Sequence, residues 1–145
     1  MIYKKANLII SLILMIGVTS CIYPFGNTVI SKPDEYSRVY EVKEKVVLRA
    51  IAGVVREKSM GINVTIDNIN HRVDSDYVIS GGWRIKTTAN VKQINWKECE
   101  VILSITTEKK TNNGWEMRRL LQKDQYDIFF SEIDSKNYEE MSKIQ

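Results

Sequence analysis

The sequence predicts an α+β fold in which an N-terminal and a C-terminal helix cover one face of an antiparallel sheet of three to four strands. Apolar residues recur at helical spacing near both ends of the predicted domain, and between these segments they alternate with polar residues as in strands. Neither an amphipathic helix nor a one-faced sheet buries its apolar side alone, so we expect a two-layer packing. With 145 residues, 43% of them hydrophobic and 27% charged, the chain has the size of one small domain.

The N-terminal helix is predicted to run for about 25 residues, from position 34 to the glycine at position 61. Ser31 and Pro33 suit the cap and the start of a helix, and Gly61 suits its end. The apolar positions that follow the helical period are Tyr36, Val39, Tyr40, Val47, Ala50, Ile51 and Val54.

Three runs of residues after this helix alternate apolar and polar side chains, and they are predicted as strands with one solvent-exposed face. A polar turn at Asp74-Ser75-Asp76 is expected between the first two runs. The pair Gly81-Gly82 is interpreted as a bulge or a close approach of the backbone to a helix. The inward residues are Ile62, Val64 and Ile66 in the first run, Ile79, Gly81, Trp83 and Ile85 in the second, and Cys99, Val101, Leu103 and Ile105 in the third.

The last two elements are a returning strand and the C-terminal helix. Asn112-Asn113-Gly114 is a hairpin signal, after which the chain is expected to return as a strand through Trp115, Met117, Arg119 and Leu121. Asp124 is expected to cap the helix, whose last residues, 138–145, are expected to fray. Its apolar positions at helical spacing are Tyr126, Phe129, Phe130 and Ile133.

The first 21 residues have the pattern of an export signal. Lys4 and Lys5 precede the apolar run Leu8–Val18, which ends in Val18-Thr19-Ser20-Cys21. This ending resembles the lipobox of bacterial lipoproteins. The resemblance implies cleavage between Ser20 and Cys21 and a diacylglycerol on Cys21, with palmitate among its acyl chains, that anchors the protein in a membrane of the cell envelope. In a cell with two membranes this would be the outer one.

The predicted organisation is therefore a signal peptide at 1–20, a tether at 21–33 and one α+β domain at 34–145. Two alternatives remain for the first segment. An uncleaved anchor could start near Ala6, because no charged residue lies between Lys5 and Lys32, or an ordinary cleaved signal could leave a soluble product. In all three cases the remainder of the chain is exported. The mature domain also resembles, only in element order and location, the small α+β modules of accessory lipoproteins that assist envelope assembly.

The composition argues against several classes of function for this protein. The chain has 21 Lys and Arg against 18 Asp and Glu, and removal of residues 1–20, which contain two lysines, leaves 19 against 18. No basic cluster suggests a nucleic-acid partner. One His and two Cys are too few for a protein-built zinc or iron–sulfur site, so neither a metal nor another cofactor is expected. If Cys21 carries lipid, Cys99 has no intrachain partner for a disulfide.

Two groups of residues are candidates for catalysis, and neither is favoured. His71 and Cys99 could form a nucleophilic pair, but Cys99 has the inward parity of its strand and His71 lies in a polar loop. Glu98 and Glu100 project from one strand face about 7 Å apart, near the spacing of glycosidase carboxylates. A symmetric loop over 89–95 would place Arg84 opposite Glu100 and Lys86 opposite Glu98, as a solvated charge ladder. No catalytic residue is therefore assigned.

The tryptophans give the last expectation. Trp83 and Trp115 share the inward parity of aliphatic neighbours and are predicted as core, whereas Trp96 lacks such neighbours and is the candidate contact for a protein partner. The sequence thus favours a lipid-anchored envelope lipoprotein with a non-catalytic binding or accessory role toward another envelope component. The alternatives are a small envelope hydrolase with an unrecognised site and a surface lipoprotein that binds external ligands.

Overall fold

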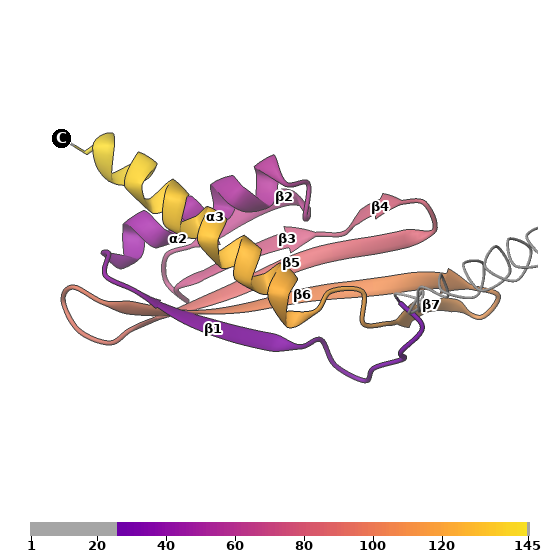
Figure 1. Ribbon diagram of the computed structural model, residues 1–145. Coiled ribbons are helices and arrows are strands. Elements are labelled where there is room, and N and C mark those ends of the chain that lie inside the picture. Colours follow the sequence, from indigo (N-terminus) through magenta and orange to yellow (C-terminus); the bar gives the residue numbers. More distant parts are fainter. Residues whose placement is uncertain (1–25, 145) are drawn as a thin grey trace, which may run out of the picture.

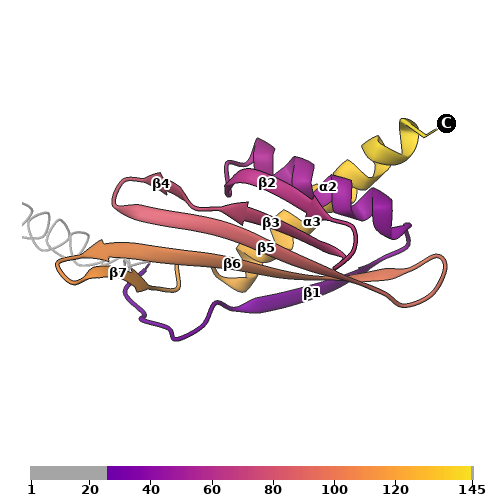
Figure 2. The same cartoon turned by 180° about the vertical axis from the view of Figure 1, so that it is seen from behind.

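The computed structural model describes residues 26–144, which form two layers with both helices on one face of an antiparallel sheet (Figure 1). Within this part of the chain, the other face of the sheet is not covered by a helix (Figure 2). The predicted α+β class and the antiparallel sheet are confirmed, but the sheet has seven strands rather than three or four. In chain order the elements are β1 (Glu35–Tyr40), α2 (Glu44–Glu57), β2 (Ile62–Asp67), β3 (Arg72–Asp76), β4 (Val78–Ser80), β5 (Trp83–Gln93), β6 (Cys99–Thr111), β7 (Gly114–Met117) and α3 (Lys123–Ser142).

The two longest strands, β5 and β6, have 11 and 13 residues and form the centre of the sheet. The strand order is β1-β6-β5-β3-β2, and the short strands β4 and β7 pair with the far ends of β5 and β6. The register of β5 and β6 runs from Trp83 opposite Lys109 to Gln93 opposite Cys99. The β4–β5 and β6–β7 hairpins therefore lie together at one end of the sheet, and the β5–β6 turn lies at the other (Figures 1 and 2).

The first part of the predicted N-terminal helix is a strand. β1 pairs with β6 along its whole length, with Tyr36 opposite Leu103 and Tyr40 opposite Cys99, and α2 begins only at Glu44. The prediction was wrong here because Tyr36 and Tyr40, four residues apart, fit the helical period and the strand period equally well. Pairing with β6, which no local pattern reveals, decides between the two.

The second predicted strand is a hairpin of two strands, β4 and β5. Ser80 pairs with Trp83 across Gly81 and Gly82, whose φ angles are 57° and 78°. Two consecutive positive φ angles are the geometry of a tight hairpin turn, and glycine adopts them without steric cost. The pair is therefore a turn and neither a bulge nor a helix contact.

The polar turn predicted at residues 74–76 was also misplaced, because these residues belong to β3. The turn between β2 and β3 lies at residues 68–71. Asp67 Oδ1 accepts hydrogen bonds of 2.9 Å from the backbone N–H groups of Ile69 and Asn70, which is the local capping that favours a turn after aspartate.

The core lies between the helices and the half of the sheet that they cover, which is the half next to the β5–β6 turn. The predicted inward positions of β6 are confirmed: Cys99, Val101, Leu103 and Ile105 are buried. α2 and α3 lie side by side over this surface (Figure 1). The helix residues that complete the core include Val47, Leu48, Ala50, Ile51 and Val55 from α2 and Tyr126, Phe129, Phe130 and Ile133 from α3.

The C-terminal helix is present as predicted, but it starts with a different cap. Gln122 is its N-cap, and the side chains of Gln122 and Gln125 form a reciprocal capping box. Asp124 lies within the first turn, where a negative charge is favourable to the helix dipole. The helix continues to Ser142, through most of the segment that was expected to fray.

Candidate functional site

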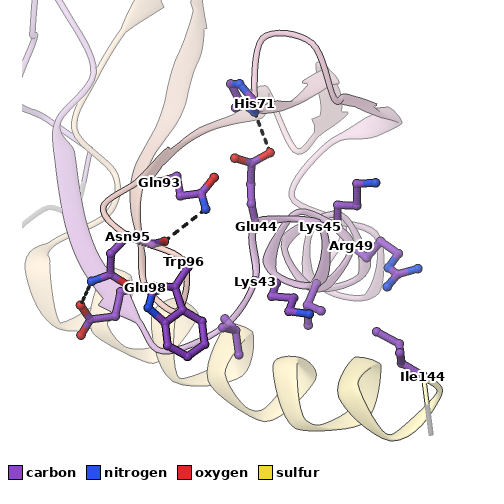
Figure 3. A pocket seen from close by; sticks show the side chains of 12 residues that line it. Lys43, Glu44, Lys45, Arg49, His71, Gln93, Asn95, Trp96, Glu98 and Ile144 are labelled. Atoms are coloured by element: carbon purple, nitrogen blue, oxygen red, sulfur yellow. Dashed lines mark hydrogen bonds and ion pairs between the residues drawn. The ribbon is translucent and has the colours of Figure 1, made fainter.

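A pocket lies at the end of the sheet that holds the β5–β6 turn (Figure 3). The turn forms one wall and the start of α2 forms the other, and the pocket has a volume of about 440 Å³. These two segments are distant in the sequence and are brought together by the packing of α2 on the sheet. The residues that line the pocket are Val42, Lys43, Glu44, Lys45, Val46, Arg49, His71, Gln93, Asn95, Trp96, Glu98 and Ile144.

Asn95 fixes the shape of the turn. Its Oδ1 accepts hydrogen bonds from the backbone N–H groups of Lys97, at 2.8 Å, and Glu98, at 2.9 Å. Its Nδ2 donates to the Glu98 carboxylate, and its backbone carbonyl accepts from Gln93 Nε2 at 3.2 Å. Asparagine side chains commonly organise turns in this way. The backbone N–H groups of Ile94 and Asn95 also donate to the Glu98 carbonyl, at 3.0 and 3.3 Å, so the turn is held by its own hydrogen bonds rather than by core packing.

Trp96 lies at the top of this turn and is 74% exposed. Lys97 Nζ lies 4.4 Å from the centre of its ring, close enough for a cation–π contact. Figure 3 shows the indole on the turn side of the pocket, across from Lys43, the N-cap residue of α2, and Lys45 in the first turn of that helix. Tryptophan is enriched among the residues that dominate the binding energy of protein–protein interfaces.

Glu44 joins the helix wall to the β2–β3 turn. His71 Nδ1 lies 2.6 Å from Glu44 Oε1, and the His71 backbone has a φ angle of 53°. Glu44 also occupies the first turn of α2, where a carboxylate is favoured by the helix dipole. His71 is thus in an exposed loop, as predicted, but it has a specific carboxylate partner that the sequence did not reveal.

The remaining charges of the pocket make its helix wall basic. Arg49 Nε lies 3.6 Å from Glu140 Oε2, whereas Lys43 and Lys45 have no ion-pair partner among residues 26–144. The acidic residues of the pocket are both engaged, Glu44 with His71 and Glu98 with Asn95. Because the Asn95 amide is neutral, Glu98 keeps its negative charge, and the pocket presents charges of both signs.

Cys99 and His71 are not brought together as a nucleophilic pair. The Cys99 thiol is fully buried, and its Sγ contacts the carbonyl oxygen of Val42 at 3.4 Å, while His71 contacts Glu44. Burial raises the pKa of the Cys99 thiol to about 11, and the nearby charge of Glu44 adds to the shift. A thiol with a raised pKa and no access to solvent is a packing residue.

The predicted charge ladder has the wrong register. Arg84 lies opposite Glu108 rather than Glu100, and Glu100 lies opposite Lys92. Glu98 is outside β6 and bonds to Asn95. The prediction failed because β5 continues to Gln93, which leaves a short turn where a longer loop was assumed. The two carboxylates are therefore in different surroundings and do not face a common cleft.

The other two tryptophans are not in the core. Trp83 and Trp115 are both partly exposed, at the end of the sheet opposite the pocket. Trp83 does have the predicted inward parity, but it is the first residue of β5, and the helices do not extend over the end of β5 that pairs with β4 (Figure 1). Trp115 lies on the uncovered face, where it stacks with Arg84 at 4.7 Å.

Among residues 26–144, no group of three or more His, Cys, Asp or Glu side chains is arranged to hold a metal ion. In the same part of the chain, neither helix combines the length and apolar character needed to cross a membrane. The predicted cleavage and lipidation residues, Ser20 and Cys21, lie outside the described residues.

The site therefore combines one predicted residue, Trp96, with several that sequence reasoning missed. Lys43 and Lys45 were placed inside a long helix and could not be assigned to a pocket wall. Their only local signal is the charged run at residues 43–45, at the true start of the helix. No protein-family model compared with the chain matches it, and no curated protein compared with it matches either.

Proposed function

We propose that this protein is a lipid-anchored bacterial envelope lipoprotein whose domain binds another envelope protein at the Trp96 pocket and performs no catalysis of its own. The observation that carries the binding role is Trp96, a 74%-exposed tryptophan on the wall of the pocket. An exposed side chain of this size is costly to leave in water and becomes favourable when a partner covers it.

The anchor is supported by the sequence of the first 21 residues. The basic start, the apolar run and the box Val18-Thr19-Ser20-Cys21 agree with one another in order and length. A diacylglycerol thioether would supply two acyl chains, which bind a membrane stably where one chain binds it only marginally.

The pocket offers a protein partner an aromatic contact together with charges of both signs. Trp96 offers a large apolar and aromatic contact. Within the described part of the chain, Lys43 and Lys45 offer positive charge, and Glu98 offers negative charge, without an ion-pair partner. Charge at the edge of an interface mainly guides association and selects the partner, while the buried aromatic residue supplies affinity.

The binding role is tested by crosslinking in cells followed by capture of the protein and quantitation of the crosslinked partner. Trp96→Ala should reduce capture at least tenfold, because truncation of a central interface tryptophan commonly costs about 2 kcal/mol or more. Tyr138→Ala is the matched control, since Tyr138 is an exposed aromatic residue (68%) on α3 that does not line this pocket. Normal capture by Trp96→Ala, with circular dichroism showing both variants folded, would contradict the proposal.

The anchor is tested separately by metabolic labelling with a fatty-acid analogue. Wild-type protein should be labelled and should fractionate with membranes, and Cys21→Ser should lose the label. An unlabelled wild-type protein in the soluble fraction would remove the lipoprotein proposal and leave the binding role of Trp96 open to its own test.

A further inference from the structure

The end of the sheet opposite the Trp96 pocket has its own chemical character. Here the β4–β5 and β6–β7 hairpins extend beyond both helices (Figures 1 and 2). β6 runs for 13 residues from the pocket end to this end, so the two ends are about 40 Å apart at the rise of a strand. We call this region, formed by residues 78–84 and 108–119, the hairpin end.

The N-terminal part of the described chain is fixed to the hairpin end. Gly26 is buried, and a side chain there would collide with the Trp83 ring. Residues 28–30 then lie along β7 and beyond it: Ile30 N–H donates to the Met117 carbonyl at 3.1 Å, and Arg119 N–H donates to the Thr28 carbonyl at 2.9 Å. The described chain therefore begins at this end of the domain.

The distance from Cys21 to the hairpin end is limited by chain length. Five peptide units separate Cys21 from Gly26, so even a fully extended chain spans at most about 18 Å between them. A lipid on Cys21 would thus hold the hairpin end near the membrane surface. When the strands stand perpendicular to the membrane, the Trp96 pocket lies too far along the sheet to reach the membrane surface.

The charges of the hairpin end are positive once internal pairs are counted. Arg84 pairs with Glu108, and Arg118 Nη2 pairs with Glu116 Oε2 at 2.6 Å. Lys109 and Lys110 follow each other in β6 and have no ion-pair partner within residues 26–144. Lysines close to a bilayer are attracted to anionic headgroups, by about fivefold in affinity for each lysine.

The apolar residues of the hairpin end suit the same surface. Ile79 in β4 is 64% exposed. Trp83 and Trp115 are partly exposed, and Lys109 Nζ lies 5.7 Å from the centre of the Trp83 ring. Tryptophan next to lysine is typical of protein surfaces at the level of lipid headgroups.

We propose that the hairpin end is a membrane-contact surface that rests on anionic lipid headgroups and holds the Trp96 pocket about 40 Å from the bilayer. The inference rests on the proposed lipidation of Cys21, because that anchor brings the hairpin end to the membrane. Together, the short connection and the basic, tryptophan-containing surface make the β5–β6 hairpin a spacer that presents the pocket to a partner away from the membrane.

The test uses the full chain as processed in cells, reconstituted into phosphatidylcholine vesicles with or without phosphatidylglycerol. A fluorophore is attached to Asn113→Cys at the hairpin end or to Lys97→Cys at the pocket end, and a headgroup-labelled lipid quenches it at short range. Cys99 is buried and does not compete for the label. With phosphatidylglycerol present, the probe at position 113 should be strongly quenched and the probe at position 97 should not.

Charge reversal provides a matched comparison. Lys110→Glu should shift the equilibrium away from membrane contact at least fivefold in anionic vesicles, whereas Lys92→Glu should leave it unchanged. Both lysines are exposed and lie on the uncovered face of the sheet, at opposite ends. The difference should disappear in vesicles of phosphatidylcholine alone.

The outcomes separate this inference from the anchor proposal. A protein that does not float with the vesicles lacks the anchor, which overturns the lipoprotein proposal and this inference with it. A protein that floats but shows equal quenching at positions 113 and 97, or stronger quenching at 97, is anchored without the proposed orientation. An equal response to Lys110→Glu and Lys92→Glu would likewise overturn the role of the basic surface.

Discussion

The half of the sheet under the helices and the half beyond them are stabilised by different interactions, although both are built from β5 and β6. In the covered half, aliphatic residues such as Val101 and Leu103 are completely buried against α2 and α3. In the extended half, the Arg84 guanidinium lies between the rings of Tyr77, at 4.3 Å, and Trp115, at 4.7 Å. Stacking and ion pairing thus replace aliphatic burial where no helix covers the strands.

This difference shows how β5 and β6 can remain ordered where they extend beyond the hydrophobic core. In the extended half β4, β5, β6 and β7 form a small sheet, and a small sheet needs a packed apolar face for independent stability. Here Glu108 accepts a hydrogen bond of 3.0 Å from the Tyr77 hydroxyl and pairs with Arg84, so the charged residues and rings form one network on the uncovered face. The hairpin end is consequently ordered by side chains that also leave it polar enough to face water or headgroups.

The largest expected loss of stability comes from a substitution in the covered half of the sheet. Leu103→Ala should lower the free energy of unfolding by about 3 kcal/mol, because it removes buried methyl groups and leaves a cavity under the helices. Urea unfolding followed by circular dichroism measures the loss. Ile102→Ala, at the neighbouring position on the uncovered face, is the control and should cost less than half as much. Equal losses would mean that the helices do not define the core.

The second largest loss of stability is expected from a substitution in the extended half of the sheet. Arg84→Ala should lower the free energy of unfolding by about 2 kcal/mol, since it removes both stacking contacts and leaves the Glu108 carboxylate, whose side chain is 11% exposed, without its cation. Arg84→Lys should recover part of the loss, because lysine keeps the charge but not the planar stacking.

Tryptophan fluorescence separates this local loss from global unfolding. Trp115 and Trp83 lie in the extended half and Trp96 at the far turn, so a Trp96→Phe background reports on the hairpin end alone. An Arg84→Ala protein with wild-type stability and unchanged fluorescence would show that the network is not what orders the hairpin end.

The sequence predicts the covered half better than the extended half, for a physical reason. Burial under a helix requires strict alternation, and this alternation correctly identified Cys99, Val101 and Leu103 as inward residues. Alternation also gave Trp83 its correct parity, but it carries no information on how far a helix reaches along a strand. Trp83 was therefore assigned to a core that ends before it.

The register of β5 against β6 could not be predicted from the sequence, for a similar reason. The β5–β6 pairing depends on where the turn lies, and the run from Val91 to Trp96 contains neither a glycine nor a proline to mark it. The Asn112-Asn113-Gly114 signal, by contrast, correctly placed the β6–β7 hairpin. Of the pocket, the sequence predicts Trp96 as a contact residue and considers His71 and Glu98 only as catalytic candidates. The lysines at the start of α2 reach the pocket through tertiary packing alone.

The pH dependence of stability offers a smaller effect that belongs to the covered half. Because burial raises the pKa of Cys99 to about 11, the unfolded chain releases this proton at lower pH than the native protein does. Stability should therefore fall between the ordinary thiol pKa near 9 and pH 11. Cys99→Ala should remove this part of the decline, while the decline above pH 10 that comes from buried Tyr126, whose pKa is raised to about 12, should persist.

Thiol reactivity gives an independent measurement of the same burial. Cys99 in the native protein should resist a thiol reagent at pH 8 and should react when the chain is unfolded in urea. Rapid modification of the native protein would place the thiol at the surface and would contradict the covered core at this end of β6.

The smallest effect is expected for the carboxylates that the sequence placed in a common ladder. Replacing Glu98 and Glu100 together by Gln should change the free energy of unfolding by less than about 1 kcal/mol, because Glu100 is a partly exposed residue opposite Lys92 and a glutamine at position 98 could still accept the hydrogen bond from Asn95. Partner capture should also be retained, since Trp96 and the lysines of α2 are unchanged. Urea unfolding and the crosslinking assay measure the two properties on the same protein. A folded double variant that loses capture, alongside a Trp96→Ala variant that keeps it, would move the binding surface from the pocket to the carboxylates and would reopen the carboxylate-site alternative.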